Sequence, residues 1–181
     1  MRLLRLIVLT IAAFAALAGA AAAESMRYLS FEAMSDAAKW RTGDVTLAIR
    51  KGLLSRSVDV LFRRKGSDLP LHPSDAPFDV YALQPLMAGK DPDGYRLYAV
   101  DPKAGAKFTG FACEGKAEKS WVAISSPRPY KPLTIYVVRW DQETKAPALC
   151  VAMDYRFRGE WKFPPAANRA PQENPYYSTA G

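Results

Sequence analysis

The segment that most constrains the fold is residues 133–157, in which two apolar runs flank a polar stretch containing a proline. In the second run, 149–157, apolar side chains occupy every other position, which is the period of a β-strand. In the first run, 133–140, both alternate sets are largely apolar, so this strand needs cover on both faces. We therefore expect a hairpin with a long loop at the centre of a mainly β domain.

Further short segments have strand-like composition and are separated by turn residues. We expect them at 45–49, 58–62, 78–87, 95–100, 108–113 and 120–125. Pro85 weakens the third, the proline-rich stretch 67–77 is expected to be a surface loop, and 126–132 is expected to be extended and polyproline-like. With the hairpin, these segments predict an antiparallel β-sandwich or small β-barrel of about eight short strands.

One N-terminal helix is expected at residues 30–42. Ser30 is a suitable N-cap, and Gly43 suits the left-handed position just past the end. Phe31, Met34 and Ala38 form an apolar stripe at helical spacing. Such a stripe indicates a helix that packs on the sheet.

The first residues have the layout of a secretory signal peptide. Arg2 and Arg5 precede an apolar run at 6–17, and small residues lead to Ala23. The run is shorter than the roughly 20 residues that a spanning helix needs. We expect residues 1–23 to be cleaved, which leaves an exported periplasmic or extracellular protein without a transmembrane segment.

The remainder is expected to form a single β-rich domain at 24–163, followed by a disordered tail at 164–181 that is rich in proline, alanine and asparagine. Cys113 and Cys150 are not in a metal-ligand spacing. In an oxidising compartment such a pair predicts one disulfide.

Charge and basic residues suggest an anionic partner. The chain has a net charge of +7, and loss of Arg2 and Arg5 lowers it to about +5. For an exported protein, anionic envelope polymers or lipid headgroups are expected partners before nucleic acid. Basic side chains on the first strand pair form the candidate ligand-binding set: Arg50, Arg63, Arg64 and Lys65. The alternative interpretation is the solvated outer face of a sheet.

No catalytic motif is present. His72 lies near Ser74 and Asp75, but neighbours in one loop rarely form a triad, because a triad is assembled by the fold. One histidine and two isolated cysteines do not predict a metal site, and no cofactor is expected. Carboxylate pairs such as Glu114 with Glu118 could support hydrolysis only if the fold placed them across a cleft.

The sequence therefore favours an exported, non-catalytic binding or envelope-associated β domain. The first alternative is a small hydrolase acting on an envelope polymer. The second is an interaction subunit that docks another exported protein through an exposed apolar patch containing Trp40 or Trp121.

Overall fold

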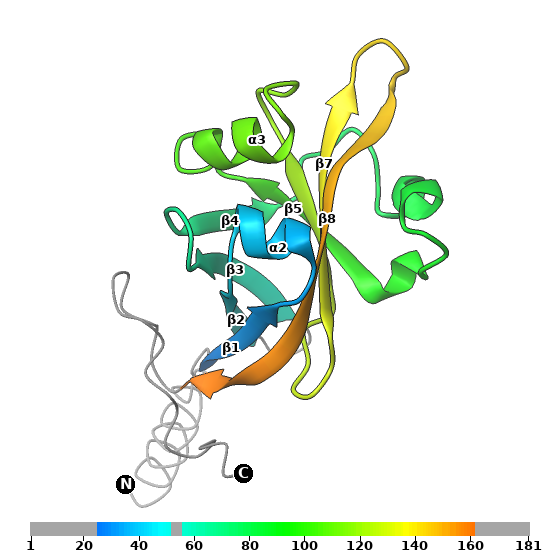
Figure 1. The fold of residues 1–181 in the computed structure, drawn as a ribbon. Coiled ribbons are helices and arrows are strands. Elements are labelled where there is room, and N and C mark those ends of the chain that lie inside the picture. Colours follow the sequence, from blue (N-terminus) through cyan, green and yellow to red (C-terminus); the bar gives the residue numbers. More distant parts are fainter. Residues whose placement is uncertain (1–24, 52–55, 162–181) are drawn as a thin grey trace, which may run out of the picture.

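The structure is a computed structural model, and it describes residues 25–51 and 56–161. Eight strands form a closed barrel in which each is antiparallel to the next and β8 pairs with β1 (Figure 1). The strands are β1 (Ser25–Ala33), β2 (Val45–Lys51), β3 (Arg56–Arg63), β4 (Leu69–Pro73), β5 (Tyr95–Val100), β6 (Trp121–Ser125), β7 (Leu133–Asp141) and β8 (Ala146–Trp161). The expected leader 1–23 and the expected tail 164–181 lie outside the described residues.

The mainly β, antiparallel prediction is confirmed, and closure between β1 and β8 makes the fold a barrel rather than a sandwich. The central hairpin is also confirmed as β7 and β8, which pair from Leu133 opposite Tyr155 to Asp141 opposite Ala146. Ile135 faces the barrel interior, whereas Tyr136 belongs to a second apolar cluster outside it. Both faces of β7 are therefore covered, as its composition predicts.

The expected helix at 30–42 is wrong at its start. Strand β1 continues to Ala33, and helix α2 spans Asp36–Arg41 with Ser35 as its N-cap. Leu29, Phe31 and Ala33 alternate into the barrel core, where β1 is paired on both sides by β2 and β8. Pairing with two strands thus outweighs the helical spacing of the same apolar residues.

The glycine that ends the helix is as expected. Gly43 has a φ of +64° and its N–H donates to the Ala38 carbonyl. The conformation is left-handed, which glycine adopts without the clash of a Cβ.

Three other expectations are wrong. Residues 108–113 belong mainly to helix α3 (Ala106–Ala112), and residues 78–87 contain the 3₁₀ helix η1 (Tyr81–Leu86) rather than a strand. Within the expected loop 67–77, β4 forms because Leu69 and Leu71 reach the barrel core. In each case tertiary burial decides a segment whose local signals are mixed.

Two helices close one end of the barrel. In an up-and-down barrel alternate connections lie at the same end, and α2 and α3 occupy the β1–β2 and β5–β6 connections. Figure 1 shows both helices over this end. Ala38 of α2 and Phe108 and Ala112 of α3 are buried in the interior cluster. We call this the closed end.

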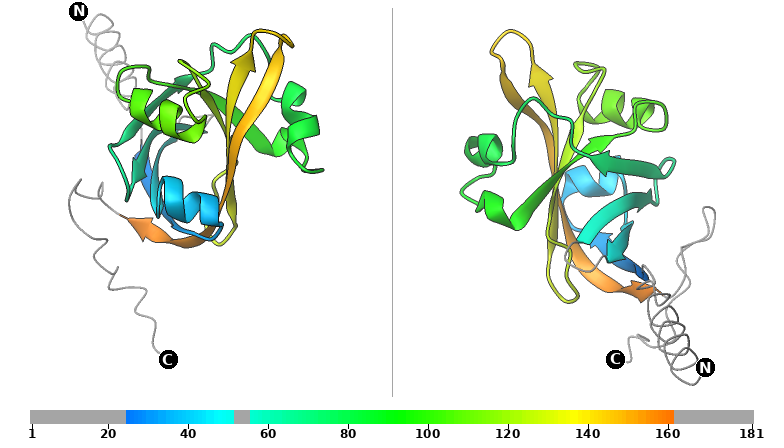
Figure 2. Two further views of the ribbon diagram at one scale, coloured as in Figure 1. Left: turned by 45° about the horizontal axis from the view of Figure 1, so that its top comes forward. Right: turned by 180° about the vertical axis from the view of Figure 1, so that it is seen from behind.

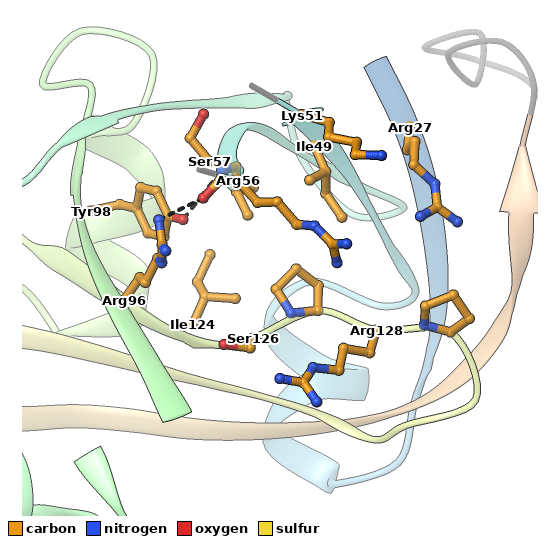
Figure 3. A pocket seen from close by; sticks show the side chains of 13 residues that line it. Arg27, Ile49, Lys51, Arg56, Ser57, Arg96, Tyr98, Ile124, Ser126 and Arg128 are labelled. Atoms are coloured by element: carbon orange, nitrogen blue, oxygen red, sulfur yellow. Dashed lines mark hydrogen bonds between the residues drawn. The ribbon is translucent and has the colours of Figure 1, made fainter. Parts of the chain in front are cut away.

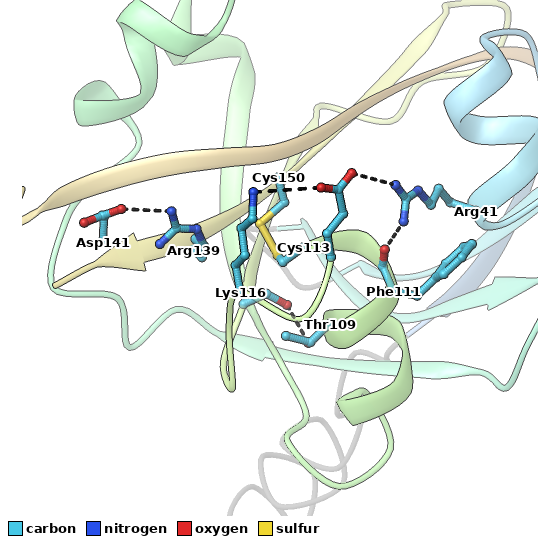
Figure 4. The surroundings of a disulfide bond; sticks show 10 residues. Arg41, Thr109, Phe111, Cys113, Lys116, Arg139, Asp141 and Cys150 are labelled. Atoms are coloured by element: carbon cyan, nitrogen blue, oxygen red, sulfur yellow. Dashed lines mark hydrogen bonds and ion pairs between the residues drawn. A yellow bond between two sulfur atoms is a disulfide. The ribbon is translucent and has the colours of Figure 1, made fainter. Parts of the chain in front are cut away.

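A disulfide fixes α3 to the barrel. Cys113, the C-cap of α3, is bonded to Cys150 of β8, as predicted (Figure 4). The ladder shifts between Val137 and Val138, so that Cys150 lies between the paired positions Leu149 and Val151. This bulge lets Cys150 pack against the interior cluster while Leu149 is exposed. Next to the disulfide, Glu114 contacts Arg41 of α2 at 3.7 Å.

The connection between β4 and β5 packs outside the barrel. It carries η1 and η2 (Pro92–Gly94), and Figure 2 shows it from behind, beside β7 and β8. Leu83 and Met87 are buried against Trp121 and Tyr136 in the second apolar cluster. None of the helices in the described residues has the length and apolar character needed to cross a bilayer.

Candidate functional site

A hollow with a volume of about 870 Å³ lies at the end of the barrel opposite the two helices. Its wall is formed by the first residues of β1, β3 and β5, the last residues of β2 and β6, and the loop after β6. Five cationic side chains line it (Figure 3): Arg27, Lys51, Arg56, Arg96 and Arg128. We call this hollow the basic bowl. No acidic side chain is among the described residues that line it.

Strand periodicity explains why these cations gather here. Arg27 is two positions before Leu29, Lys51 is two after Ile49, and Arg96 is two before Tyr98; the apolar partner in each pair belongs to the interior cluster. Successive side chains of a strand point to opposite faces. Each cation therefore continues the inward-facing row of its strand beyond the point where the core ends.

Arg56 follows the same rule, whereas Arg128 reaches the bowl from the loop after β6. Arg56 is two positions before Val58, which is buried in the interior cluster. Arg128 is four positions after Ile124 and lies in a loop between Pro127 and Pro129. These prolines restrict the backbone conformations of the loop that carries Arg128.

Two of the five cations have defined partners. The guanidinium of Arg27 donates to both carboxylate oxygens of Glu160, at 2.7 and 2.6 Å. Arg96 donates to the backbone carbonyl of Arg56 at 2.7 Å. The hydrogen bond from Arg27 holds the pKa of Glu160 below its ordinary value, so this carboxyl is ionised at neutral pH.

The side chains of Lys51, Arg56 and Arg128 form no ion pair or hydrogen bond with another side chain in the described part of the chain. Lys51 and Arg56 are exposed at the rim. Three cationic groups around one hollow, with low-dielectric walls below them, concentrate positive potential in it. Their charge is available to an anionic ligand.

The floor of the bowl is apolar apart from one hydroxyl. Ile49, Val58 and Ile124 are almost fully buried, and Tyr98 is 7 % exposed. The Tyr98 hydroxyl accepts a hydrogen bond from the backbone N–H of Val58 at 3.2 Å. Desolvation raises the pKa of Tyr98, so the phenol keeps its proton and its O–H group remains a donor.

The basic residues singled out in the sequence do not form one surface. Arg50 lies near the bowl end of β2 and is paired with Asp59 at 2.6 Å. Arg63 lies opposite Val45 at the other end of this strand pair, five residues from Arg50 along β2, or roughly 16 Å.

Three of these residues belong to the closed end. Arg63 stacks over the ring of Phe108 and donates to the carbonyl of Ser67. Arg64 approaches Asp44 at 3.8 Å, and Lys65 donates to the carbonyl of Lys39. The structure thus brings Arg63, Arg64 and Lys65 together and leaves Arg50 apart.

The loop near His72 holds separate contacts rather than a triad. His72 lies 3.5 Å from Asp101, whereas Asp75 accepts hydrogen bonds from Lys119 and Trp121 and Ser74 bonds to the N–H of Ala76. Among the described residues no group of three or more histidine, cysteine or carboxylate side chains is placed to hold a metal ion.

The two tryptophans considered as residues of an exposed apolar patch differ in their exposure to solvent. Trp121 is buried under the β4–β5 connection, and Trp40 is 68 % exposed at the closed end.

Sequence reasoning missed Arg27 and Arg96. The sequence shows Lys51 and Arg56 as basic residues of the first strand pair and Arg128 as a neighbour of Tyr130, but it does not bring them to one hollow. For three of the five cations a signal was present: Arg27, Lys51 and Arg56 each stand two positions from an apolar residue at the end of an alternating run. Extending the period of two outward from each run would have placed these three on the inward face at the same end. Both faces of β5 are largely apolar, so the same extension does not place Arg96.

Comparison of the chain with protein-family models, with curated proteins and with solved structures finds no match.

Proposed function

We propose that this chain is an exported, non-catalytic binding domain that holds an anionic ligand in the basic bowl. The observation that carries the proposal is the ring of five cations, contributed by four strands and one loop, around a hollow that no acidic side chain lines among the residues the structure describes. Guanidinium groups suit phosphate and carboxylate oxygens because their N–H groups form a planar fork.

Export is part of the proposal. The leader-like residues 1–23 support it, and so does the Cys113–Cys150 disulfide, because disulfides persist mainly in oxidising compartments. There an anionic envelope component, either a polymer segment or a lipid headgroup, would meet the bowl. Both present phosphate or carboxylate groups.

The test compares two triple variants that remove the same charge from opposite ends. The first changes Lys51, Arg56 and Arg128 to Gln. The control changes three exposed residues of the closed end to Gln, which are Lys39, Arg64 and Lys65. Binding of inorganic pyrophosphate is measured by calorimetry at about 50 mM and 200 mM salt, over which the Debye length falls from about 14 to 7 Å.

We expect the bowl variant to lose about tenfold or more in affinity, since a hydrogen bond to a charged group contributes about 1.5–3 kcal/mol. The closed-end control should keep most of its affinity, and wild-type binding should weaken as salt rises. Equal losses of affinity in both variants would show that pyrophosphate binding depends only on the net charge of the protein. Loss in the closed-end variant alone would place the ligand at the other end of the barrel.

A further inference from the structure

A second hollow adjoins the basic bowl on the outer wall of the barrel. It has a volume of about 880 Å³ and lies between β3, β4, β5 and the connection that follows β4. We call it the outer groove. Four residues line both hollows: Ser57, Val58, Arg96 and Tyr98. The two hollows therefore meet at the rim where β3 and β5 begin.

The strand ladder explains this junction. Strand β4 pairs with β3 only at Val60 and Leu61, and with β5 only from Tyr98 to Val100. Within the described part of the chain, no strand lies between the first residues of β3 and those of β5. Side chains bridge them instead: Arg96 donates to the carbonyl of Arg56, and Tyr98 accepts from the N–H of Val58.

The chemistry of the outer groove differs from that of the bowl. Phe78, Val80 and Leu97 line it and are half-buried, so each leaves apolar surface accessible. The cation Arg50 in this groove is already paired with Asp59 at 2.6 Å. His72 and Asp79, which are exposed, also line the groove. The groove thus offers apolar surface, together with polar groups, beside a cationic hollow.

We propose that the ligand of the basic bowl is an anionic amphiphile whose apolar part lies in the outer groove. The inference rests on the proposed function, because the charged group is placed by the bowl cations. The ligand crosses the rim at Ser57 and Arg96, which both hollows share. Its anionic group meets Lys51, Arg56 and Arg128, and its uncharged chain covers Leu97 and Phe78.

The test uses inorganic phosphate and a series of monoalkyl phosphates from butyl to octyl, each below its micellar concentration. Burial of one methylene contributes about 0.8 kcal/mol, which is about fourfold in Kd when burial is complete. An open groove covers one side of the chain, so we expect about twofold per added methylene and about tenfold or more across the series.

The variant Leu97→Ala removes apolar surface from the groove, and Val80→Thr keeps the side-chain shape while replacing one methyl group with a hydroxyl. Both should reduce the gain per methylene and leave affinity for inorganic phosphate unchanged. The matched control is Leu149→Ala, because Leu149 is an exposed leucine on the β7–β8 hairpin. It should keep the full chain-length dependence.

The results separate this inference from the proposed function. If inorganic phosphate and alkyl phosphates all fail to bind, the basic bowl is not an anion site and both proposals fall. If phosphate binds but affinity does not change from butyl to octyl, the bowl is an anion site and the amphiphile is excluded. A gain per methylene that survives both groove variants also overturns the placement in the groove.

Discussion

Arg27 and Glu160 form an ion pair with two hydrogen bonds, of 2.7 and 2.6 Å, across the β1–β8 seam that closes the barrel. The arginine lines the basic bowl, whereas the carboxylate is not among its lining residues. Glu160 therefore offsets the charge of Arg27 from a position outside the bowl lining. This pairing limits the attraction of the bowl for anions.

Replacing Glu160 with Gln should strengthen anion binding, because the charge of Arg27 is then no longer offset. We expect pyrophosphate affinity to rise by a factor of up to about five, since a partly exposed pair of this kind contributes up to about 1 kcal/mol. The control is Glu32→Gln. Glu32 also links β1 to β8, through Arg156 at 2.6 Å, but neither residue lines the bowl. An equal rise in both variants would contradict the local effect.

The same pair gives a pH dependence of stability. In the native state, the hydrogen bond from Arg27 lowers the pKa of the Glu160 carboxyl from its ordinary value of 4.5. A carboxyl with a lowered native pKa stabilises the fold above its ordinary pKa, and this stabilisation is lost as pH falls through the native value. We expect Tm to fall below about pH 4.5 in the wild type, and to fall less in Glu160→Gln. Thermal unfolding between pH 3 and pH 7 checks this; an unchanged pH profile would exclude the contribution.

Removing the disulfide should destabilise the closed end without affecting the bowl. The bond spans a sequence separation of 37 residues and attaches α3 to β8. We expect the Cys113→Ala, Cys150→Ala double variant to lose about 2–5 kcal/mol of unfolding free energy in urea. Pyrophosphate affinity of the folded fraction should remain, since the bowl lies at the other end. A large loss of affinity in a fully folded variant would show that the two ends are coupled.

Replacing either of two glycines near α3 with alanine should change the free energy of unfolding, and the two changes should have opposite signs. A Cβ on Gly105 would contact the Val100 side chain and lie 2.6 Å from the Asp101 carbonyl oxygen. We expect Gly105→Ala to cost about 1–3 kcal/mol through overpacking. Gly110 lies inside α3 with open space around it, so Gly110→Ala should stabilise by about 0.5–1 kcal/mol. Urea unfolding of both variants measures the difference, and a destabilised Gly110→Ala would contradict the open environment.

Strands with strong β composition could be predicted from sequence, as β7 and β8 show. Segments compatible with two periods could not: Phe31 and Ala33 fit both a helical stripe and a strand face, and pairing with two neighbouring strands decides between them. Helix α3 contains Phe108 and Gly110, which disfavour a helix locally. Burial of Phe108 and Ala112 against the barrel core stabilises it instead.

The candidate site was harder to predict because its residues are distant in sequence. Arg27 and Arg128 are about a hundred positions apart, and closure of the barrel brings them to one hollow. In β5 both faces are largely apolar, with Tyr98 inward and Leu97 outward. Sequence alone therefore does not say that Arg96 faces the interior.

The two ends of the barrel also differ in what a substitution would change. The helices and the disulfide hold the closed end, whereas the rim consists of strand ends and the proline-containing loop of Arg128. Substitutions at the rim leave the helices and their buried contacts untouched. Under the proposed function, ligand preference can therefore diverge through exchange of rim side chains while the scaffold remains the same, and the rim is then the place to engineer new selectivity.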